Sequence, residues 1–244
     1  MLELLPQAQS LARPLLTKSR VGAVVRGASG NVYLGANLEF PGVSLTQTVH
    51  AEQAALANAF MHDETGIEAI AVSAPPCGHC RQFLYEFAAG RDIEILLPGE
   101  PAMLLSALLP RPFGPADLQV TQGPLSQPSV APPDANDNPT QSARYAAAKS
   151  YAPYSHSPSG IAIRTRRGSI YRGSYIENAA FNPSLSPLQA ALVCLSVANE
   201  DFGDIAEVVL AEASNNSVSH VSAARSLLAV IAPKAEFRLL PRAK

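Results

Sequence analysis

The feature that most constrains how this 244-residue chain can fold is an internal repeat. Six pairs of identical residues lie 138 positions apart: Gly22 and Gly160, Arg26 and Arg164, Gly30 and Gly168, Tyr33 and Tyr171, Gly35 and Gly173, Glu39 and Glu177. The spacing then becomes 136, which places residues 53–56 over residues 189–192, both reading Gln-Ala-Ala-Leu. So many identities with one two-residue gap indicate a duplication, so we expect two copies of one folded module.

A proline-rich segment separates the two copies. Residues 123–139 contain five prolines and no aromatic residue, a composition that neither a helix nor a central strand accommodates. We therefore expect a first module over residues 1–122, a linker over 123–140 and a second module over 141–244.

Hydrophobic periodicity and turn residues predict a similar order of elements in both copies. In the first, we expect a helix at 6–16, a hairpin at 21–40 turning at 28–30, a helix at 50–62, a strand at 67–74, a helix at 77–89, a strand at 93–97 and a helix at 102–109. In the second, we expect a helix at 141–151, a hairpin at 160–175, a helix at 187–199, a strand at 206–211, a helix at 221–231 and a strand at 236–240. Strands alternating with helices predict an α/β layered sheet.

Composition narrows the possible partners. The chain is 47% hydrophobic with a formal net charge of −2, whereas binders of polyanions are usually basic, so a nucleic-acid partner is not expected. No run approaches the ~18 apolar residues of a membrane span, and the start of the chain lacks the pattern of a signal peptide. We therefore expect a cytoplasmic protein without a membrane partner. The odd count of three cysteines argues against a disulfide framework.

Four residues in the first copy form a candidate metal site. His50 and Glu52 open one predicted helix, and Cys77 and Cys80 open another. One imidazole and two thiolates supply three ligands of a tetrahedral zinc and leave the fourth position for water, which is the arrangement of a catalytic zinc site. A helix N-terminus favours the thiolate form. Glu52 is close enough in sequence to reach that water without being a ligand, so it is the candidate general acid–base.

Two structural alternatives stay open for this motif. His79, between the cysteines, could close the site as a fourth ligand, or the cysteines could form a redox-active dithiol. Neither explains the upstream His-x-Glu, and His79 is expected to point away from the face that the cysteines share. The other histidines, His62, His156 and His220, fall where helix ends or loops are expected and are interpreted as surface or capping residues. Cys194 is expected to pack as a small apolar residue within a helix.

His-x-Glu followed by Pro-Cys-x-x-Cys is the signature of zinc-dependent deaminases. The chain resembles the two-module cytidine deaminases of bacteria and plants over nearly its whole length. The matching stretches are residues 35–42 (Gly-Ala-Asn-Leu-Glu-Phe-Pro-Gly), 48–55 (Thr-Val-His-Ala-Glu-Gln-Ala-Ala), 76–83 (Pro-Cys-Gly-His-Cys-Arg-Gln-Phe), 112–115 (Pro-Phe-Gly-Pro) and 177–183 (Glu-Asn-Ala-Ala-Phe-Asn-Pro).

The resemblance implies a fold, an activity and an assembly. The fold would be a duplicated α/β/α layered module around a mixed sheet, with a degenerate second copy. The activity would be zinc-dependent hydrolytic deamination of free cytidine or deoxycytidine to uridine or deoxyuridine and ammonia, a step of pyrimidine salvage. The assembly would be a homodimer with one zinc per chain.

The resemblance also implies roles for individual residues outside the metal site. Asn37 and Glu39 would bind the ribose 3′-hydroxyl, the Ala51 amide would contact the base, and Phe113 would reach the site of the partner subunit. A position where many relatives carry an aromatic residue against the pyrimidine is Ser19 here.

The repeat predicts that only the first copy is catalytic. At the spacing of 136, His50 and Glu52 correspond to Ser186 and Leu188, which can replace neither an imidazole ligand nor a carboxylate. The zinc motif alone leaves two further functions open, namely a polynucleotide-editing deaminase and a zinc-binding interaction protein without turnover. The Asn37-x-Glu39 pair, the absence of Trp and the slightly acidic charge favour a free nucleoside as the substrate.

Overall fold

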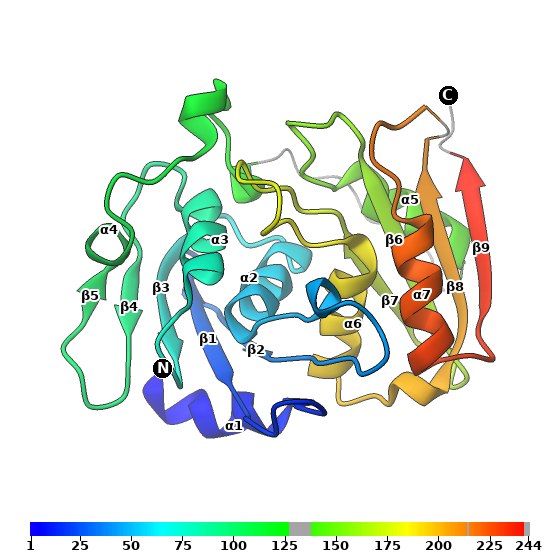
Figure 1. The fold of residues 1–244 in the computed structure, drawn as a ribbon, viewed down its shortest axis with the longest axis horizontal. Coiled ribbons are helices and arrows are strands. Elements are labelled where there is room, and N and C mark those ends of the chain that lie inside the picture. The colour runs from blue at the N-terminus through cyan, green and yellow to red at the C-terminus, as the bar shows by residue number, and fades with distance from the viewer. Residues whose placement is uncertain (127–137, 214, 242–244) are drawn as a thin grey trace. The chain divides into compact units, whose positions relative to one another are not determined.

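The computed structural model describes residues 1–126, 138–213 and 215–241, and Figure 1 labels its helices and strands. The chain forms two compact units. The first contains Met1–Glu39, Thr48–Gln127 and Asn178–Ser184, and the second contains Phe40–Gln47, Pro128–Glu177 and Leu185–Lys244. Each unit therefore includes a short segment that belongs, by sequence, to the other repeat. Residues 127–137 of the predicted linker lie outside the described residues, and the boundaries 1–122, 123–140 and 141–244 stay a prediction.

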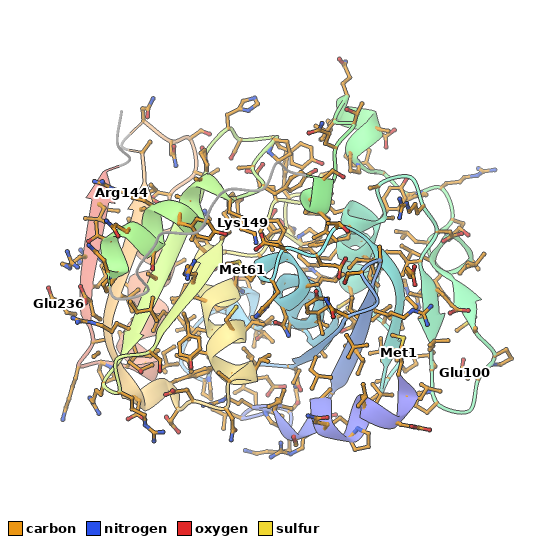
Figure 2. All side chains as sticks on the ribbon, turned by 180° about the vertical axis from the view of Figure 1, so that it is seen from behind. Met1, Met61, Glu100, Arg144, Lys149 and Glu236 are labelled. Atoms are coloured by element: carbon orange, nitrogen blue, oxygen red, sulfur yellow. The ribbon has the colours of Figure 1, made fainter. Side chains whose placement is uncertain are left out.

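The first unit contains a five-stranded mixed sheet in the order β2-β1-β3-β4-β5. All neighbouring pairs are antiparallel except β3 and β4, which are parallel. The strands are β1 (Gly22–Gly27), β2 (Val32–Ala36), β3 (Ile67–Val72), β4 (Glu94–Leu96) and β5 (Met103–Leu104). The helices are η1 (Leu2–Leu4), α1 (Leu5–Ser10), α2 (Ala51–Met61), α3 (Gly78–Ala88), α4 (Leu105–Leu108), η3 (Pro115–Leu118) and η4 (Pro124–Ser126), and Figure 2 marks Met61 at the end of α2.

Helices α1 and α2 cover opposite faces of this sheet. Leu34 of β2 lies in the cluster that α1 forms with the sheet. The next residue, Gly35, faces α2, where a Cβ atom would lie 2.1 Å from the backbone nitrogen of Ala55. Successive residues of a strand point to opposite faces, so the helices form two outer layers. A glycine is required at position 35 because the helix backbone approaches so closely.

The second unit repeats this arrangement with a four-stranded mixed sheet in the order β7-β6-β8-β9. Its strands are β6 (Ser159–Thr165), β7 (Ile170–Ser174), β8 (Ile205–Glu212) and β9 (Glu236–Pro241). Its helices are η2 (Leu45–Gln47), α5 (Pro139–Ala148), α6 (Pro187–Val197), η5 (Phe202–Asp204) and α7 (Val221–Ile231). Gly160 faces α5 and Gly173 faces α6, each where a Cβ atom would lie within 2.1 Å of helix backbone.

The two units match in irregular details as well as in strand order. The register of β1 against β3 shifts at Arg26/Gly27, and that of β6 against β8 shifts at Arg164/Thr165, which is 138 positions later. Isolated bridges join Leu38 to Arg13 and Val49, and the corresponding Ile176 to Tyr151 and Leu185. These matches confirm the predicted duplication of a mixed α/β module.

Two predicted helices differ from the structure. The helix expected at 6–16 ends at Ser10, because Pro14 disfavours a helical Arg13 and Arg13 instead pairs with Leu38 in a parallel bridge. The helix expected at 102–109 is reduced to α4, because Met103 and Leu104 form β5 against β4. Among the described residues, no helix has the length and apolar character that a membrane crossing requires.

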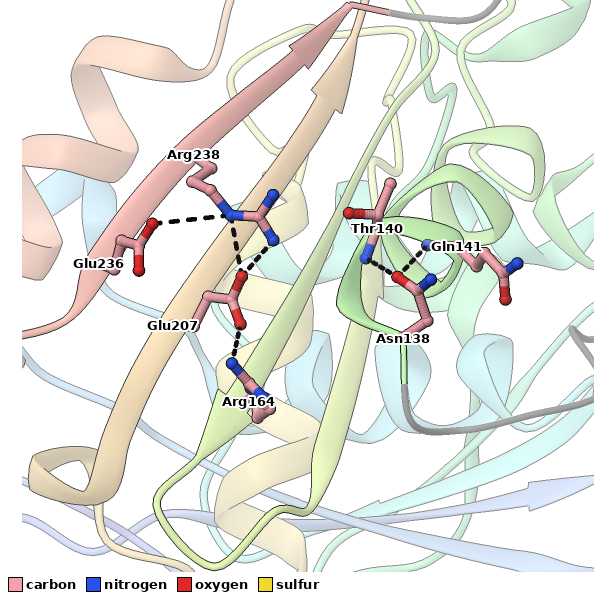
Figure 3. Close-up of polar contacts among 7 residues, drawn as sticks. All are labelled: Asn138, Thr140, Gln141, Arg164, Glu207, Glu236 and Arg238. Carbon is pink, nitrogen blue, oxygen red and sulfur yellow. Dashed lines mark hydrogen bonds and ion pairs between the residues drawn. The ribbon is translucent and has the colours of Figure 1, made fainter.

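Polar contacts in the second unit fix its outer elements (Figure 3). Glu207 of β8 is buried and forms ion pairs with Arg164 on β6 and Arg238 on β9. These ion pairs satisfy a carboxylate that would otherwise be costly to bury. Asn138 caps α5 by accepting hydrogen bonds from the backbone N–H groups of residues 140 and 141, at 2.9 and 3.4 Å.

Candidate functional site

Two helix N-termini of the first unit bring the predicted metal ligands together. His50 is the N-cap residue of α2, and Cys77 is the N-cap residue of α3, with Cys80 in the first turn of that helix. Pro75 and Pro76 end the extended segment after β3 and lead into α3. The sequence thus places all three side chains at one end of the sheet.

The three side chains have the geometry of a metal site. The Nδ1 atom of His50 lies 3.5 Å from the Sγ atom of Cys77 and 3.3 Å from that of Cys80, and all three ligand atoms lie within 4.8 Å of one another. Bonds of about 2.1 Å to nitrogen and 2.3 Å to sulfur at tetrahedral angles would separate such atoms by roughly 3.5 Å. One imidazole and two thiolates around this space suit zinc.

The two cysteines differ in acidity. The pKa of the Cys77 thiol is lowered to about 4, chiefly because the Cys80 thiol donates a hydrogen bond to it, and the Cys80 backbone and the His50 charge add to this effect. The pKa of Cys80 is raised by the same hydrogen bond and by burial. Cys77 is thus poised as a thiolate before a cation binds.

His79 does not belong to this group. Its ring centroid lies 5.2 Å from that of His50, but among the described residues the set of metal-ligating atoms within reach of one ion consists of His50, Cys77 and Cys80 alone. Burial lowers the pKa of His79, as expected for a ring packed against neighbouring side chains. Three protein ligands therefore leave a position for water or substrate.

Glu52 lies beside this site in the first turn of α2. Its side chain is buried, and burial raises its pKa, against the opposing effects of hydrogen bonds and the His50 charge. A carboxyl group with a raised pKa can both accept and donate a proton near neutral pH.

A cavity of about 300 Å³ joins the metal ligands to the predicted sugar-binding residues. Its lining consists of Thr17, Ser19, Val21, Asn37, Glu39, Thr48, His50, Ala51, Glu52, Ala74, Pro75 and Cys77. Six of the eight predicted site residues therefore line this cavity. A seventh, Cys80, does not line it but contacts His50, which does. Thr17 and Thr48 were not predicted, although a hydroxyl group just before the hairpin is a signal that could have indicated Thr17.

The carboxylate of Glu39 accepts four hydrogen bonds from its own unit. The backbone N–H groups of Leu16 and Thr17 donate to Oε2 at 2.7 and 2.8 Å, and the Thr17 hydroxyl and Asn37 amide donate to Oε1 at 2.6 and 3.1 Å. Burial opposes ionisation, yet these hydrogen bonds lower the pKa of Glu39. A carboxylate has about four acceptor positions, so a sugar hydroxyl would have to share or replace one of these donors.

The equivalent carboxylate in the second unit accepts three of the same four hydrogen bonds. Glu177 accepts hydrogen bonds from the backbone N–H groups of Tyr154 and Ser155, at 2.8 and 3.2 Å, and from the Ser155 hydroxyl. These donors correspond to Leu16 and Thr17 in the repeat. The buried glutamate therefore fixes the turn before the hairpin in both units, whether or not a metal site lies beside it.

Phe113 does not line this cavity. Its side chain is 50% exposed, and its backbone oxygen accepts a 2.8 Å hydrogen bond from Gln82. A contact with a partner subunit stays a prediction for this residue.

The remaining histidines and Cys194 follow their predicted positions with one exception. His62 is the C-cap residue of α2, and His156 lies exposed in a loop. His220 is the N-cap residue of α7, but it is buried rather than a surface residue, because its ring packs edge-on against Tyr175 with centroids 4.3 Å apart. Cys194 is half-buried in α6.

Comparisons with known proteins point to one family. Two family models, both described as the cytidine and deoxycytidylate deaminase zinc-binding region, match residues 1–94 and 105–225. The curated cytidine deaminases of Salmonella paratyphi B and Salmonella newport are each 48% identical over 209 residues, which cover 86% of this chain and 71% of theirs. A crystal structure of cytidine deaminase from Mycobacterium tuberculosis is 31% identical, covers 44% of this chain and 89% of its own, and superposes with a TM-score of 0.40.

The sequence identity extends over both repeats, and the three candidate zinc ligands are all present. The chain therefore belongs to the cytidine deaminases.

Proposed function

We propose that this chain hydrolyses free cytidine and deoxycytidine to uridine and deoxyuridine with release of ammonia, as a step of pyrimidine salvage. The proposal rests on one observation: His50, Glu52 and Glu39 line the wall of one and the same cavity. One end offers metal ligands and a proton carrier, and the other offers acceptors for a sugar. A cavity of this kind suits a free nucleoside.

The proposed chemistry assigns the zinc ligands and Glu52 separate roles. His50, Cys77 and Cys80 would hold zinc, which, when bound, lowers the pKa of a coordinated water to about 7 and so supplies a nucleophile at neutral pH. Glu52 takes a proton from the attacking water as a bond forms to C4 of the pyrimidine. It then delivers that proton to N3 and carries the remaining proton of the new C4 hydroxyl group to the amine, so that ammonia leaves as the C4–N bond breaks and the C4 carbonyl forms.

Asn37, Glu39 and Ala51 would orient the nucleoside. The side chains of Asn37 and Glu39 are held rigidly, since the Asn37 amide also donates to the Ser19 oxygen at 3.0 Å and accepts from the Val21 N–H at 2.9 Å. A sugar hydroxyl that enters this network would bind in one orientation. The backbone N–H of Ala51 lies at the start of α2, where such groups lack intrahelical partners, so it suits a polar atom of the base.

The proposal is tested by measuring ammonia release from cytidine, deoxycytidine, cytosine, adenosine and single-stranded DNA. We expect turnover of the two nucleosides and little of the others. Glu52→Gln should retain zinc and turn over at least about a hundredfold more slowly, since a general acid–base contributes 10²–10⁴-fold. Zinc binding without ammonia release from any substrate would instead favour a non-enzymatic zinc protein.

We infer a homodimer as the working assembly, in which Phe113 reaches the partner's site. The exposed Phe113 ring supports this inference because it contributes nothing to the cavity of its own unit. Light scattering gives the mass in solution. Mixing Phe113→Ala and Glu52→Gln proteins should then regenerate active sites after subunit exchange. If verified mixed dimers recover no activity, Phe113 does not reach the partner's site.

The thiol ligands favour a reducing compartment, and we place the protein in the cytoplasm.

A further inference from the structure

Gln53 connects a metal ligand to a segment of the second repeat. It is the third residue of α2 and is buried. Its Oε1 atom accepts a 3.3 Å hydrogen bond from the backbone N–H of His50, and its Nε2 atom donates a 3.0 Å hydrogen bond to the backbone oxygen of Pro183. One amide group thus holds the N-cap of α2 and segment Asn178–Ser184, which belongs to the same unit.

The same segment also holds α3, the helix that carries the two cysteine ligands. The side-chain amide of Asn178 donates a 3.0 Å hydrogen bond to the Gln82 oxygen, and the backbone N–H of Ala179 donates a 2.9 Å hydrogen bond to the carboxylate of Glu86. Glu86 is fully buried, so this contact is shielded from water.

The segment is stiffened by its own hydrogen bonds. The Ser184 hydroxyl accepts a bond from the Asn178 N–H at 3.0 Å, and the Asn178 Oδ1 atom accepts one from the Ala180 N–H at 2.9 Å. Asn178 is fully buried. A rigid segment in contact with α2 and α3 can fix the separation between the starts of the two helices, on which the spacing of the ligand atoms depends.

We propose that segment Asn178–Ser184 braces the metal centre and that Gln53 is the positioning residue through which it orients His50. The proposal rests on the metal site of the proposed function. It gives the repeat without metal ligands a direct part in zinc retention. Partners that orient zinc ligands commonly alter metal affinity by 10–100-fold when they are removed.

The second unit supplies a matched control. Gln189 is the third residue of α6, its Oε1 atom accepts a 2.9 Å hydrogen bond from the Ser186 N–H, and its Nε2 atom donates to the Gln47 oxygen at 3.0 Å. Gln189 therefore makes the same two contacts as Gln53, with a helix whose N-cap is a serine. A merely structural role predicts equal effects at the two positions.

The experiment compares zinc release from purified holoenzyme to excess chelator for Gln53→Met and Gln189→Met, together with urea midpoints. We expect similar losses of stability, but zinc release at least about tenfold faster in Gln53→Met only. Equal release rates in the two variants, whether both unchanged or both accelerated, would overturn the proposal. Because no substrate is present, the result is independent of whether the chain deaminates cytidine.

Two further variants keep the test decisive if Gln53→Met does not fold. Gln53→Glu can still accept a hydrogen bond from His50 but cannot donate one to Pro183, so it should also release zinc faster. Zinc release at the wild-type rate would show that segment Asn178–Ser184 does not act on the metal centre through Gln53. Ser184→Ala loosens the segment without touching either helix. It should accelerate zinc release and shift the visible absorption bands of the cobalt-substituted protein, whereas unchanged release and spectrum would contradict the proposal.

Discussion

Glu39 and Glu177 occupy equivalent positions in the two repeats. Comparing variants at the two positions therefore separates a role in sugar binding from a role in folding. Glu39→Gln replaces an acceptor by an NH₂ group that faces backbone donors, so both this variant and Glu177→Gln should be destabilised. Only Glu39 lines the cavity. We expect Glu39→Gln alone to raise KM for cytidine, by about 10–100-fold, since a hydrogen bond to a charged group contributes about 1.5–3 kcal/mol.

Steady-state kinetics and urea unfolding of the two variants check this expectation. If the two variants are equally stable and Glu39→Gln leaves KM for cytidine unchanged, Glu39 has a structural role only and does not bind the nucleoside.

We expect the buried side chain of His220 to make the folded protein less stable in mild acid. Burial lowers its pKa to about 4, and its Nε2 atom has no hydrogen-bond partner among the described residues. The unfolded chain takes up this proton below about pH 6.5 and the folded chain only below about pH 4, so stability falls as the pH drops between these values. The loss from this residue is about 3 kcal/mol at most.

Urea midpoints between pH 7 and pH 4 measure this effect. His220→Leu should flatten the decline, whereas His156→Leu, at an exposed histidine, should leave it unchanged. An equally steep decline in His220→Leu would assign acid sensitivity to other groups.

At the scale of the elements, the contact between β2 and α2 requires that residue 35 be a glycine, which has no side chain. A Cβ atom at residue 35 would lie 2.1 Å from the Ala55 nitrogen and 2.5 Å from the Ala51 oxygen, and backbone cannot move aside as a flexible side chain can. We expect Gly35→Ala to cost about 2 kcal/mol or more in unfolding free energy.

Gly78→Ala is the control for this prediction, because no atom lies within 4 Å of an added Cβ and the residue opens α3. Denaturant unfolding in the presence of chelator removes any contribution of zinc. Similar stabilities of the two variants would contradict the close approach of α2 to the sheet.

The elements that the sequence predicted well are those that local chemistry determines. The hairpin turn contains Gly30 at a φ of +85°, α2 is flanked by His50 and His62 as its two cap residues, and α7 has the predicted bounds of residues 221–231. The errors arose where pairing between distant strands decides the outcome, as at Arg13 and at Met103, because hydrophobic periodicity does not report a strand's partner.

The metal ligands could likewise be predicted because their spacing along two helix starts is a local property. Three of the four donors to Glu39 could not, since they belong to Leu16 and Thr17, in a turn that lies 22 and 23 residues before it in the chain. Nor could the contact of Gln53 with Pro183, because no sequence pattern indicates that segment 178–184 joins the first unit.

For the whole molecule, the repeat predicts the zinc content. Of the residues that the structure describes, one group holds three metal-ligating atoms within reach of each other, and Ser186 and Leu188 stand where the second unit would need His and Glu. We therefore expect one zinc per chain in protein purified without added metal, and none in a Cys77→Ala/Cys80→Ala variant. Metal analysis by mass spectrometry measures both, and two zincs per chain would contradict the assignment.

The exchange of segments 40–47 and 178–184 also bears on how variants of this gene would be interpreted. A substitution near residue 180 is, by linear position, a change in the half without metal ligands, yet its physical neighbours are Gln53, Gln82 and Glu86. Truncation at the linker would deprive the first half of these contacts, so the two halves do not constitute independent genetic units. Complementation between separately expressed halves is therefore a more informative assay than the activity of either fragment.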